Sequence, residues 1–205
     1  MESMHGIFCL EGDWWGNPTK QTSVEPALTL LRNTEGFEIP YKHRNVSTRT
    51  EFEHHLEKWQ QANHDGLPIL YLAFHGEEGE LIVGGDARRN DARVNLDWLE
   101  ERVNVTGQNR MMYLGTCSTL AIHGTRINRF LENTGLSAIC GYEGPVDWMQ
   151  STVFDLLLLA SLCRLATVTP MRIWNAYEAT LKLVSPLAKQ LRFRMEAHPS
   201  IHGSR

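Results

Sequence analysis

Two residues suited to nucleophilic catalysis follow two separate apolar segments of the chain. His75 comes directly after the apolar run 67–74, and Cys117 comes three residues after the run 111–114. A cysteine attacks a carbonyl carbon as its thiolate, and an imidazole takes up the thiol proton near neutral pH. The oxyanion formed in acyl transfer needs hydrogen-bond donors, which the backbone N–H groups of Gly76 and Cys117 are placed to supply. The sequence therefore predicts a His75–Cys117 dyad for acyl transfer.

The elements that must position this pair are strands of a parallel sheet. The run 67–74 is too short for a typical helix and is bounded by Gly66 and by His75-Gly76, which is typical of a strand buried on both faces. Because such runs alternate with amphipathic helices, we expect an α/β fold with a mostly parallel sheet and helices on both faces. A right-handed crossover between successive strands then places both candidate residues on one edge of the sheet. The other expected strands are residues 7–10, 37–46, 111–114 and 136–140.

Local signals give approximate bounds for the helices. We expect Ser23 to cap a first helix, a capping box at Thr50 to open a second, and Asn95 to cap a third. A fourth helix spans about 125–133 and ends at Gly135. A buried helix follows at 151–165, another begins at 169–170, and the tail after 186 has the alternation of an edge strand.

A resemblance strengthens the prediction of a dyad. FHGEEGELIVGGD, followed after one expected helix by MMYLGTCSTLA, resembles the paired signature of the caspase-like cysteine peptidases, which include caspases, metacaspases, legumain, gingipain and separase. The resemblance implies a caspase-hemoglobinase α/β fold over nearly the whole chain, and we expect one domain over residues 1–205. It also implies that His75 is the general acid and base, that Cys117 is the nucleophile, and that Gly76 and Cys117 provide the oxyanion donors.

The chain departs from this family at the positions that set substrate preference. Caspases carry Gln two residues before the cysteine and several Arg-specific relatives carry Asp, whereas this chain has Gly115. The Arg that caspases place after the first strand is also missing. The preference for the residue before the scissile bond, P1, therefore does not carry over. The candidate substrate-binding residues are Gly115 and four acids that indicate a basic P1 residue, namely Glu11, Asp13, Glu143 and Asp147.

Several other residues leave two interpretations open. His123 also precedes a glycine and is a rival base, although it follows no buried strand. Glu77 and Glu78 either form a polar turn or orient the imidazole of His75. His54 and His55 lie on an expected helix, where a solvated face is favoured over a metal site. Three tryptophans at the expected catalytic edge either pack or form a substrate wall, and these are Trp14, Trp15 and Trp148.

Composition excludes several classes of function. The 205 residues carry a formal net charge of -4 and no large basic cluster, so we expect no nucleic-acid partner. The four cysteines are widely spaced without a CxxC pair, which argues against a zinc ribbon or a disulfide scaffold and favours a reducing, cytoplasmic setting. The N-terminus lacks the pattern of a secretion signal. The most apolar segment, 153–165, is too short to span a bilayer and carries Asp155 and Arg164 near its ends.

These observations lead to one expected function and two alternatives. We expect a caspase-like cysteine endopeptidase that cleaves proteins or peptides through a thioester without a metal or other cofactor. Since no recruitment domain is visible, we expect activation by a partner protein or a signalling ligand, and a role in bacterial defence or cell death is an analogy with small members of the group. The alternatives are an inactive caspase-fold binding or scaffold protein, and a small-molecule hydrolase or sensor on the same sheet.

Overall fold

The centre of the molecule is a six-stranded sheet. The computed structural model describes residues 4–14, 22–84 and 90–202. The strand order is β2-β1-β3-β7-β8-β9, in which the first five strands run parallel and β9 runs antiparallel to β8. The prediction of a mostly parallel sheet with an edge strand in the tail is confirmed. The strands are β1 (Ile7–Glu11), β2 (Tyr41–Asn45), β3 (Ile69–Ala73), β7 (Met111–Leu114), β8 (Ala138–Tyr142) and β9 (Phe193–Ala197).

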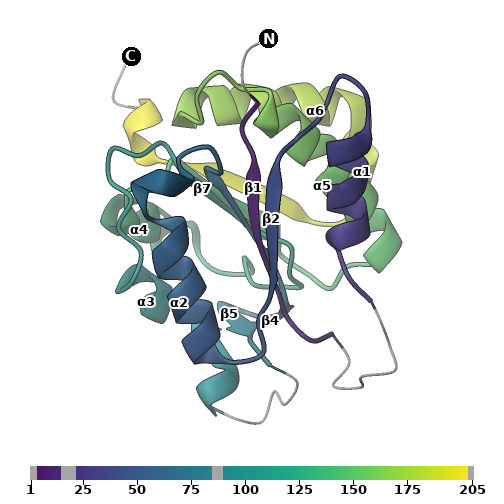
Figure 1. Ribbon diagram of the computed structural model, residues 1–205. Coiled ribbons are helices and arrows are strands. Elements are labelled where there is room, and N and C mark those ends of the chain that lie inside the picture. Colours follow the sequence, from purple (N-terminus) through teal and green to yellow (C-terminus); the bar gives the residue numbers. More distant parts are fainter. Residues whose placement is uncertain (1–3, 15–21, 85–89, 203–205) are drawn as a thin grey trace.

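Helices cover both faces of this sheet (Figure 1). One face packs on α1 (Glu25–Asn33), α5 (Trp148–Cys163) and α6 (Pro170–Gln190). The other packs on α2 (Arg49–Trp59), α3 (Leu96–Glu100) and α4 (Gly124–Thr134). Alternate side chains of β1, β3, β7 and β8 enter the two cores, and this is why these central strands are buried without interruption. The expected α/β class is therefore confirmed.

A second, antiparallel sheet extends from the end of β3. It consists of β4 (His75–Glu77), β5 (Glu80–Ile82) and β6 (Arg93–Asn95). The turn between β4 and β5 has Gly79 at φ 72°, a conformation that glycine adopts without strain. Three 3₁₀ turns complete the described elements: η1 (Ala62–His64), η2 (Asn90–Ala92) and η3 (Pro199–His202).

Two predicted helix starts were wrong by one or two residues. The hydroxyl of Thr48, and not of Thr50, accepts the N–H of Glu51 at 3.2 Å, and the Glu51 carboxylate accepts the N–H of Thr48. The N-cap of α1 is Val24 and not Ser23, whose hydroxyl donates to a buried carboxylate. The predicted caps Asn95 and Gly135 are confirmed.

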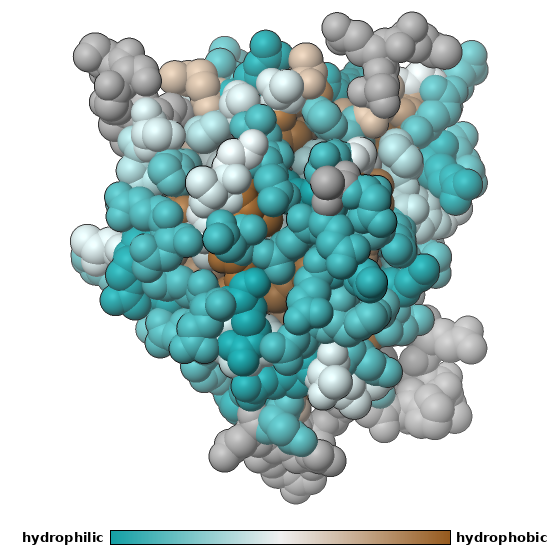
Figure 2. Space-filling model, turned by 60° about the vertical axis from the view of Figure 1, so that its left-hand side comes forward, coloured by the Kyte–Doolittle hydropathy of each residue, from teal (hydrophilic) through white to brown (hydrophobic). Residues whose placement is uncertain are grey.

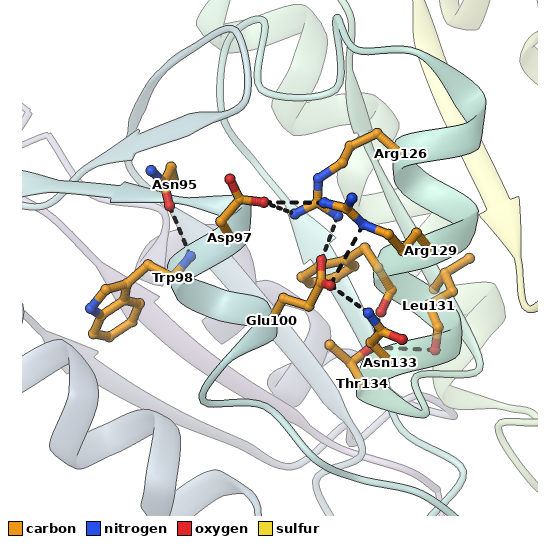
Figure 3. A network of polar contacts seen from close by, with 10 residues as sticks. Asn95, Asp97, Trp98, Glu100, Arg126, Arg129, Leu131, Asn133 and Thr134 are labelled. Atoms are coloured by element: carbon orange, nitrogen blue, oxygen red, sulfur yellow. Dashed lines mark hydrogen bonds and ion pairs between the residues drawn. The ribbon is translucent and has the colours of Figure 1, made fainter.

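Charged side chains join α3 to α4 (Figure 3). Arg126 of α4 lies 2.6 Å from Asp97 and 2.5 Å from Glu100, both on α3. Asn133 donates to Glu100 at 2.5 Å. Because α3 follows the small sheet and α4 follows the Cys117 loop, these contacts help to hold the two candidate catalytic segments in one arrangement.

The surface over α2, α3 and α4 is mostly hydrophilic, and hydrophobic atoms show through at only a few points (Figure 2). Among the described residues, the large hydrophobic side chains that are exposed lie on the helices of the opposite face: Leu30, Met149, Val153, Leu157, Met171 and Leu183. None of the described helices has the length and apolar character needed to cross a membrane.

Gly135 is a position where packing and backbone both require glycine. It ends α4 at φ 72°, and a Cβ there would lie 2.6 Å from Cα and 2.7 Å from N of Thr106. Gly36 has a similar φ of 79°, but a Cβ there would meet nothing within 4 Å. We expect Gly36→Ala to lower the free energy of unfolding by about 1 kcal/mol and Gly135→Ala by about 3 kcal/mol, because the second change adds a clash to the backbone strain. Urea denaturation measures both values, and equal losses would contradict this account.

Candidate active site

The carboxyl ends of β3 and β7 lie side by side at one edge of the central sheet. Leu72 of β3 pairs with Leu114 of β7, and each leucine precedes its candidate catalytic residue by three positions. His75 begins β4, and Cys117 lies in the loop after β7. Both residues line one pocket of about 420 Å³. The structure therefore brings the two predicted residues to the same cavity.

The loop that carries Cys117 turns sharply directly after the cysteine. Ser118 has a φ of 59°, in the left-handed region that few residues other than glycine adopt. The Ser118 N–H donates to the carbonyl of Gly144 at 3.0 Å. The Thr119 hydroxyl donates to the carbonyl of Glu80 at 3.2 Å, which ties the loop to β5. The turn leaves the side chain of Cys117 partly exposed at the pocket.

The other cysteines cannot play this role. Cys9, Cys140 and Cys163 are buried. Burial raises the pKa of all three thiols, and for Cys9 the charge of Glu11 adds to this effect. These thiols therefore stay protonated, whereas a nucleophile must ionise and reach a substrate.

The imidazole of His75 is held by the backbone of Trp14. Its Nε2 lies 2.5 Å from the carbonyl oxygen of Trp14, and its ring packs edge to face on the indole with centroids 5.3 Å apart. A carbonyl oxygen only accepts hydrogen bonds, so Nε2 carries the proton and donates it. In the neutral ring, Nδ1 then keeps its lone pair and is the nitrogen able to accept a thiol proton.

The group that orients His75 is thus a carbonyl, and neither of the two carboxylates that follow it. Glu77 accepts a hydrogen bond from Arg93 at 2.8 Å, and Glu78 is exposed in the turn. Sequence reasoning missed the role of Trp14 because every residue has a backbone carbonyl, and its direction leaves no signature in the residue type.

Gly76 lies directly against the Cys117 loop. A Cβ on Gly76 would lie 2.5 Å from the carbonyl oxygen of Cys117 and 3.0 Å from Cβ of Thr116, and it would also overlap the hydroxyl of Thr119. A larger residue would push the two segments apart. Among the described residues, no acceptor bonds the N–H of Cys117, so this donor is available to a developing oxyanion.

Aromatic side chains form the walls of the pocket. The indoles of Trp14 and Trp148 pack edge to face with centroids 4.7 Å apart, and both line the pocket. Gly115 lies there too, and a Cβ on it would meet the ring of Tyr71 at 2.7 to 2.9 Å. The third predicted tryptophan, Trp15, lies outside the described residues.

Glu11 does not line the pocket but anchors the segment that carries Trp14. It is buried at the end of β1. Burial, the largest effect, would raise the pKa of its carboxyl, but hydrogen bonds outweigh burial and the pKa is lowered. The four donors are Trp14 Nε1 at 2.6 Å, Ser23 Oγ at 2.6 Å, His43 Nε2 at 2.7 Å and the Val24 N–H at 2.8 Å.

The other predicted acids also lie away from the pocket lining. Asp13 is exposed after β1. Glu143 forms an ion pair with Arg194 at 3.1 Å, and Asp147 caps α5 by accepting the N–H of Gln150 at 2.9 Å. Of the five residues predicted to bind substrate, Gly115 alone lines the pocket that contains Cys117.

Among the described residues, the carboxylate that lines this pocket belongs to Asp155 of α5. Tyr71 donates to its Oδ2 at 2.7 Å, Tyr113 donates to its Oδ1 at 2.5 Å, and Tyr142 also donates to Oδ1. Burial raises the pKa of Asp155 to about 6, although the three hydroxyl groups act in the opposite direction. The signal that could have identified this residue is an acid within an apolar helix, because a buried carboxylate needs a specific set of partners.

The other histidines singled out in the sequence, His54, His55 and His123, are not among the described residues that line the pocket. Nδ1 of His123 lies 2.9 Å from the Thr125 hydroxyl and accepts the Thr125 N–H, so His123 is the N-cap of α4. His54 and His55 pack against each other on α2. Within the ranges that the structure describes, no group of three or more His, Cys, Asp or Glu side chains is arranged to hold a metal ion.

The role of Glu11 leads to a pH-dependent prediction. Because its pKa in the folded state lies below its ordinary value of 4.5, its contribution to stability is complete above pH 4.5 and is lost as the pH falls through the folded-state pKa. We expect Glu11→Gln to lower the free energy of unfolding by about 2 kcal/mol at pH 7, and by less below pH 4.5. Denaturation at several pH values measures this, with Glu57→Gln on the exposed side of α2 as a control. If the difference in free energy of unfolding between the wild type and Glu11→Gln does not change with pH, the lowered pKa of Glu11 is contradicted.

Comparison with known proteins places the chain in a family. A family model described as "Family of unknown function (DUF6642)" matches residues 4–195. No curated protein sequence matches significantly. Among solved structures, caspase-1 from Spodoptera frugiperda is similar with a TM-score of 0.54 and 14% identity, over 96% of this chain and 87% of that one.

A second similar structure is a complex of Porphyromonas gingivalis RgpB pro- and mature domains, with a TM-score of 0.55 and 12% identity. It covers 97% of this chain, which spans about half (48%) of the matched RgpB chain. Identities this low show the fold alone. The chain therefore has a caspase-like fold and belongs to the family of unknown function DUF6642.

Proposed function

We propose that this protein is a cysteine endopeptidase in which Cys117 is the nucleophile and His75 is the general acid and base. The observation that carries the proposal is that both residues line one pocket while Nε2 of His75 is engaged by Trp14, so that Nδ1 is the nitrogen left for the thiol.

The proposed reaction has two steps. Nδ1 of His75 takes the proton from Sγ of Cys117, and the thiolate attacks the carbonyl carbon of the scissile peptide bond. The imidazolium then gives its proton to the departing amine as the C–N bond breaks, which leaves a thioester. Water, deprotonated by the imidazole, attacks the thioester to release the carboxylic acid and restore the thiol.

The negative charge that develops in both steps needs fixed donors. The N–H of Cys117 has no acceptor among the described residues, and Gly76 packs on the same loop. We assign these two N–H groups to the carbonyl oxygen of the substrate. Backbone donors held by packing need no reorganisation during the reaction, which is how such sites lower the barrier.

Substitution at the dyad tests this function. We expect Cys117→Ala and His75→Ala each to lower peptide cleavage by more than about 1,000-fold, because each removes one partner of the proton transfer. His123→Ala is the matched control, since this histidine caps α4 outside the pocket. The measurement is cleavage of a peptide library, read as newly formed N-termini. Cleavage by Cys117→Ala at the wild-type rate would contradict the proposal that Cys117 is the nucleophile.

Alkylation tests the nucleophile without a substrate. Iodoacetamide reacts with thiolates, and three of the four cysteines are buried with a raised thiol pKa. We expect Cys117 to be labelled at least 10-fold faster than the others in the native protein, and His75→Ala to slow this labelling. Mass spectrometry of tryptic peptides measures the rates. Equal labelling of all four cysteines would favour an inactive caspase-fold binding protein.

A further inference from the structure

The pocket beside the dyad has a buried acid in its lining. Cys117 and Asp155 line the same cavity, one partly exposed and the other 5% exposed. Most of the remaining lining is apolar or aromatic, from Trp14, Val24, Tyr71, Phe74, Tyr142, Val146 and Trp148. A substrate side chain that enters beside Cys117 therefore meets mostly apolar walls, and among the described lining residues Asp155 supplies a carboxyl group.

No cation from the described part of the chain balances the charge of that carboxyl group. Its three hydrogen-bond donors are tyrosine hydroxyls, which are neutral. Among the described residues, no Lys, Arg or His forms an ion pair with Asp155. A buried carboxylate without a cation is costly, and a ligand that supplies the cation recovers part of that cost.

The hydrogen bonds also leave room for a ligand at one oxygen. Oδ1 of Asp155 accepts from both Tyr113 and Tyr142, whereas Oδ2 accepts from Tyr71 alone. A carboxylate oxygen accepts two hydrogen bonds readily. Tyr71 and Tyr142 line the pocket together with Asp155, and Tyr113 does not. Oδ2 thus keeps acceptor capacity beside a tyrosine that lines the pocket.

The walls suit the stem of a long cationic side chain. Trp14 and Trp148 both line the pocket, and indole faces attract cations. The aliphatic stems of Lys and Arg pack along apolar surface while their charged groups reach a polar partner. An acidic side chain would instead meet a like charge at Asp155.

We propose that this pocket binds a Lys or Arg side chain of the substrate at P1, with the cationic group at Oδ2 of Asp155. The inference rests on the proposed peptidase function and names its substrate class. It assigns the preference to an acid on α5, and not to Glu11, Asp13, Glu143 or Asp147, which have other partners or positions.

Matched fluorogenic peptides test the P1 preference of the wild-type protein. The peptides differ only at P1, which is Arg, Lys, citrulline, Leu or Asp, and citrulline is a neutral analogue of Arg with nearly the same shape. We expect kcat/KM for Arg or Lys to exceed that for citrulline by at least about 100-fold. Cleavage of citrulline or Leu peptides as fast as Arg peptides would overturn the inference while leaving the peptidase function intact.

Two variants on one helix then test the assignment to Asp155. We expect Asp155→Asn to lower kcat/KM for the Arg and Lys peptides by about 100-fold and to change that for citrulline less than about threefold. Asp147→Asn makes the same change at the cap of α5, where asparagine also caps well, and we expect it to keep the preference. Loss of the preference in Asp147→Asn alone would overturn the assignment.

Ligand binding separates this inference from the peptidase function and does not depend on Asp155→Asn folding. We expect Cys117→Ala to bind p-aminobenzamidine, measured by fluorescence, at least about 30-fold more tightly than the neutral 4-aminobenzamide. Equal binding would overturn the inference. Selective binding of the amidine by Cys117→Ala, combined with a wild-type protein that cleaves no peptide, would support the acidic pocket and reject the peptidase proposal.

Discussion

The parallel pairing of β3 with β7 is the constraint on which the candidate site depends. Their register aligns Leu72 with Leu114, so the two strands end at the same level of the sheet and point in the same direction. An antiparallel arrangement would place the segments that follow β3 and β7 at opposite ends of the strands. Gly76 then lets the segments touch, because a Cβ there would overlap the Cys117 loop. The parallel direction of the strands brings the two segments together, and the absence of a Cβ at Gly76 lets them pack in contact.

A polar cluster inside one of the two hydrophobic cores shapes the pocket. Tyr71 of β3, Tyr113 of β7 and Tyr142 of β8 all donate to Asp155, so one side chain of α5 binds three neighbouring strands. Satisfied networks of this kind hold a specific packing arrangement, whereas a single unpaired member would be costly. The same contacts hold α5 at a fixed position over the sheet, and with it Trp148 in the pocket wall.

Trp14 connects the histidine to this pocket. Its carbonyl accepts from His75, its ring packs on both His75 and Trp148, and its indole N–H donates to Glu11. A buried carboxylate at the end of β1 thus sets the position of the residue that orients the imidazole. The positions of Trp14 and of the His75 imidazole therefore depend on the same set of hydrogen bonds.

Local patterns predicted much of the fold. Uninterrupted apolar runs marked the central strands, and Asn95 and Gly135 marked a helix start and a helix end, because these signals depend on neighbours within a few residues. The error at α2 has a local cause too. Both Thr48 and Thr50 precede a glutamate by three residues, so the pattern fits twice, and the path of the chain out of β2 decides between them.

By itself, the sequence determined the alternation of strands and helices, and with it the placement of His75 and Cys117 at one sheet edge. Only the tertiary structure decided which carbonyl holds the imidazole and which acid lines the pocket. Trp14 lies 61 residues from His75, and Tyr71 lies 84 residues from Asp155. Contacts over such separations depend on how helices pack on the sheet, and hydrophobic periodicity shows which face of an element is buried but not what that face touches.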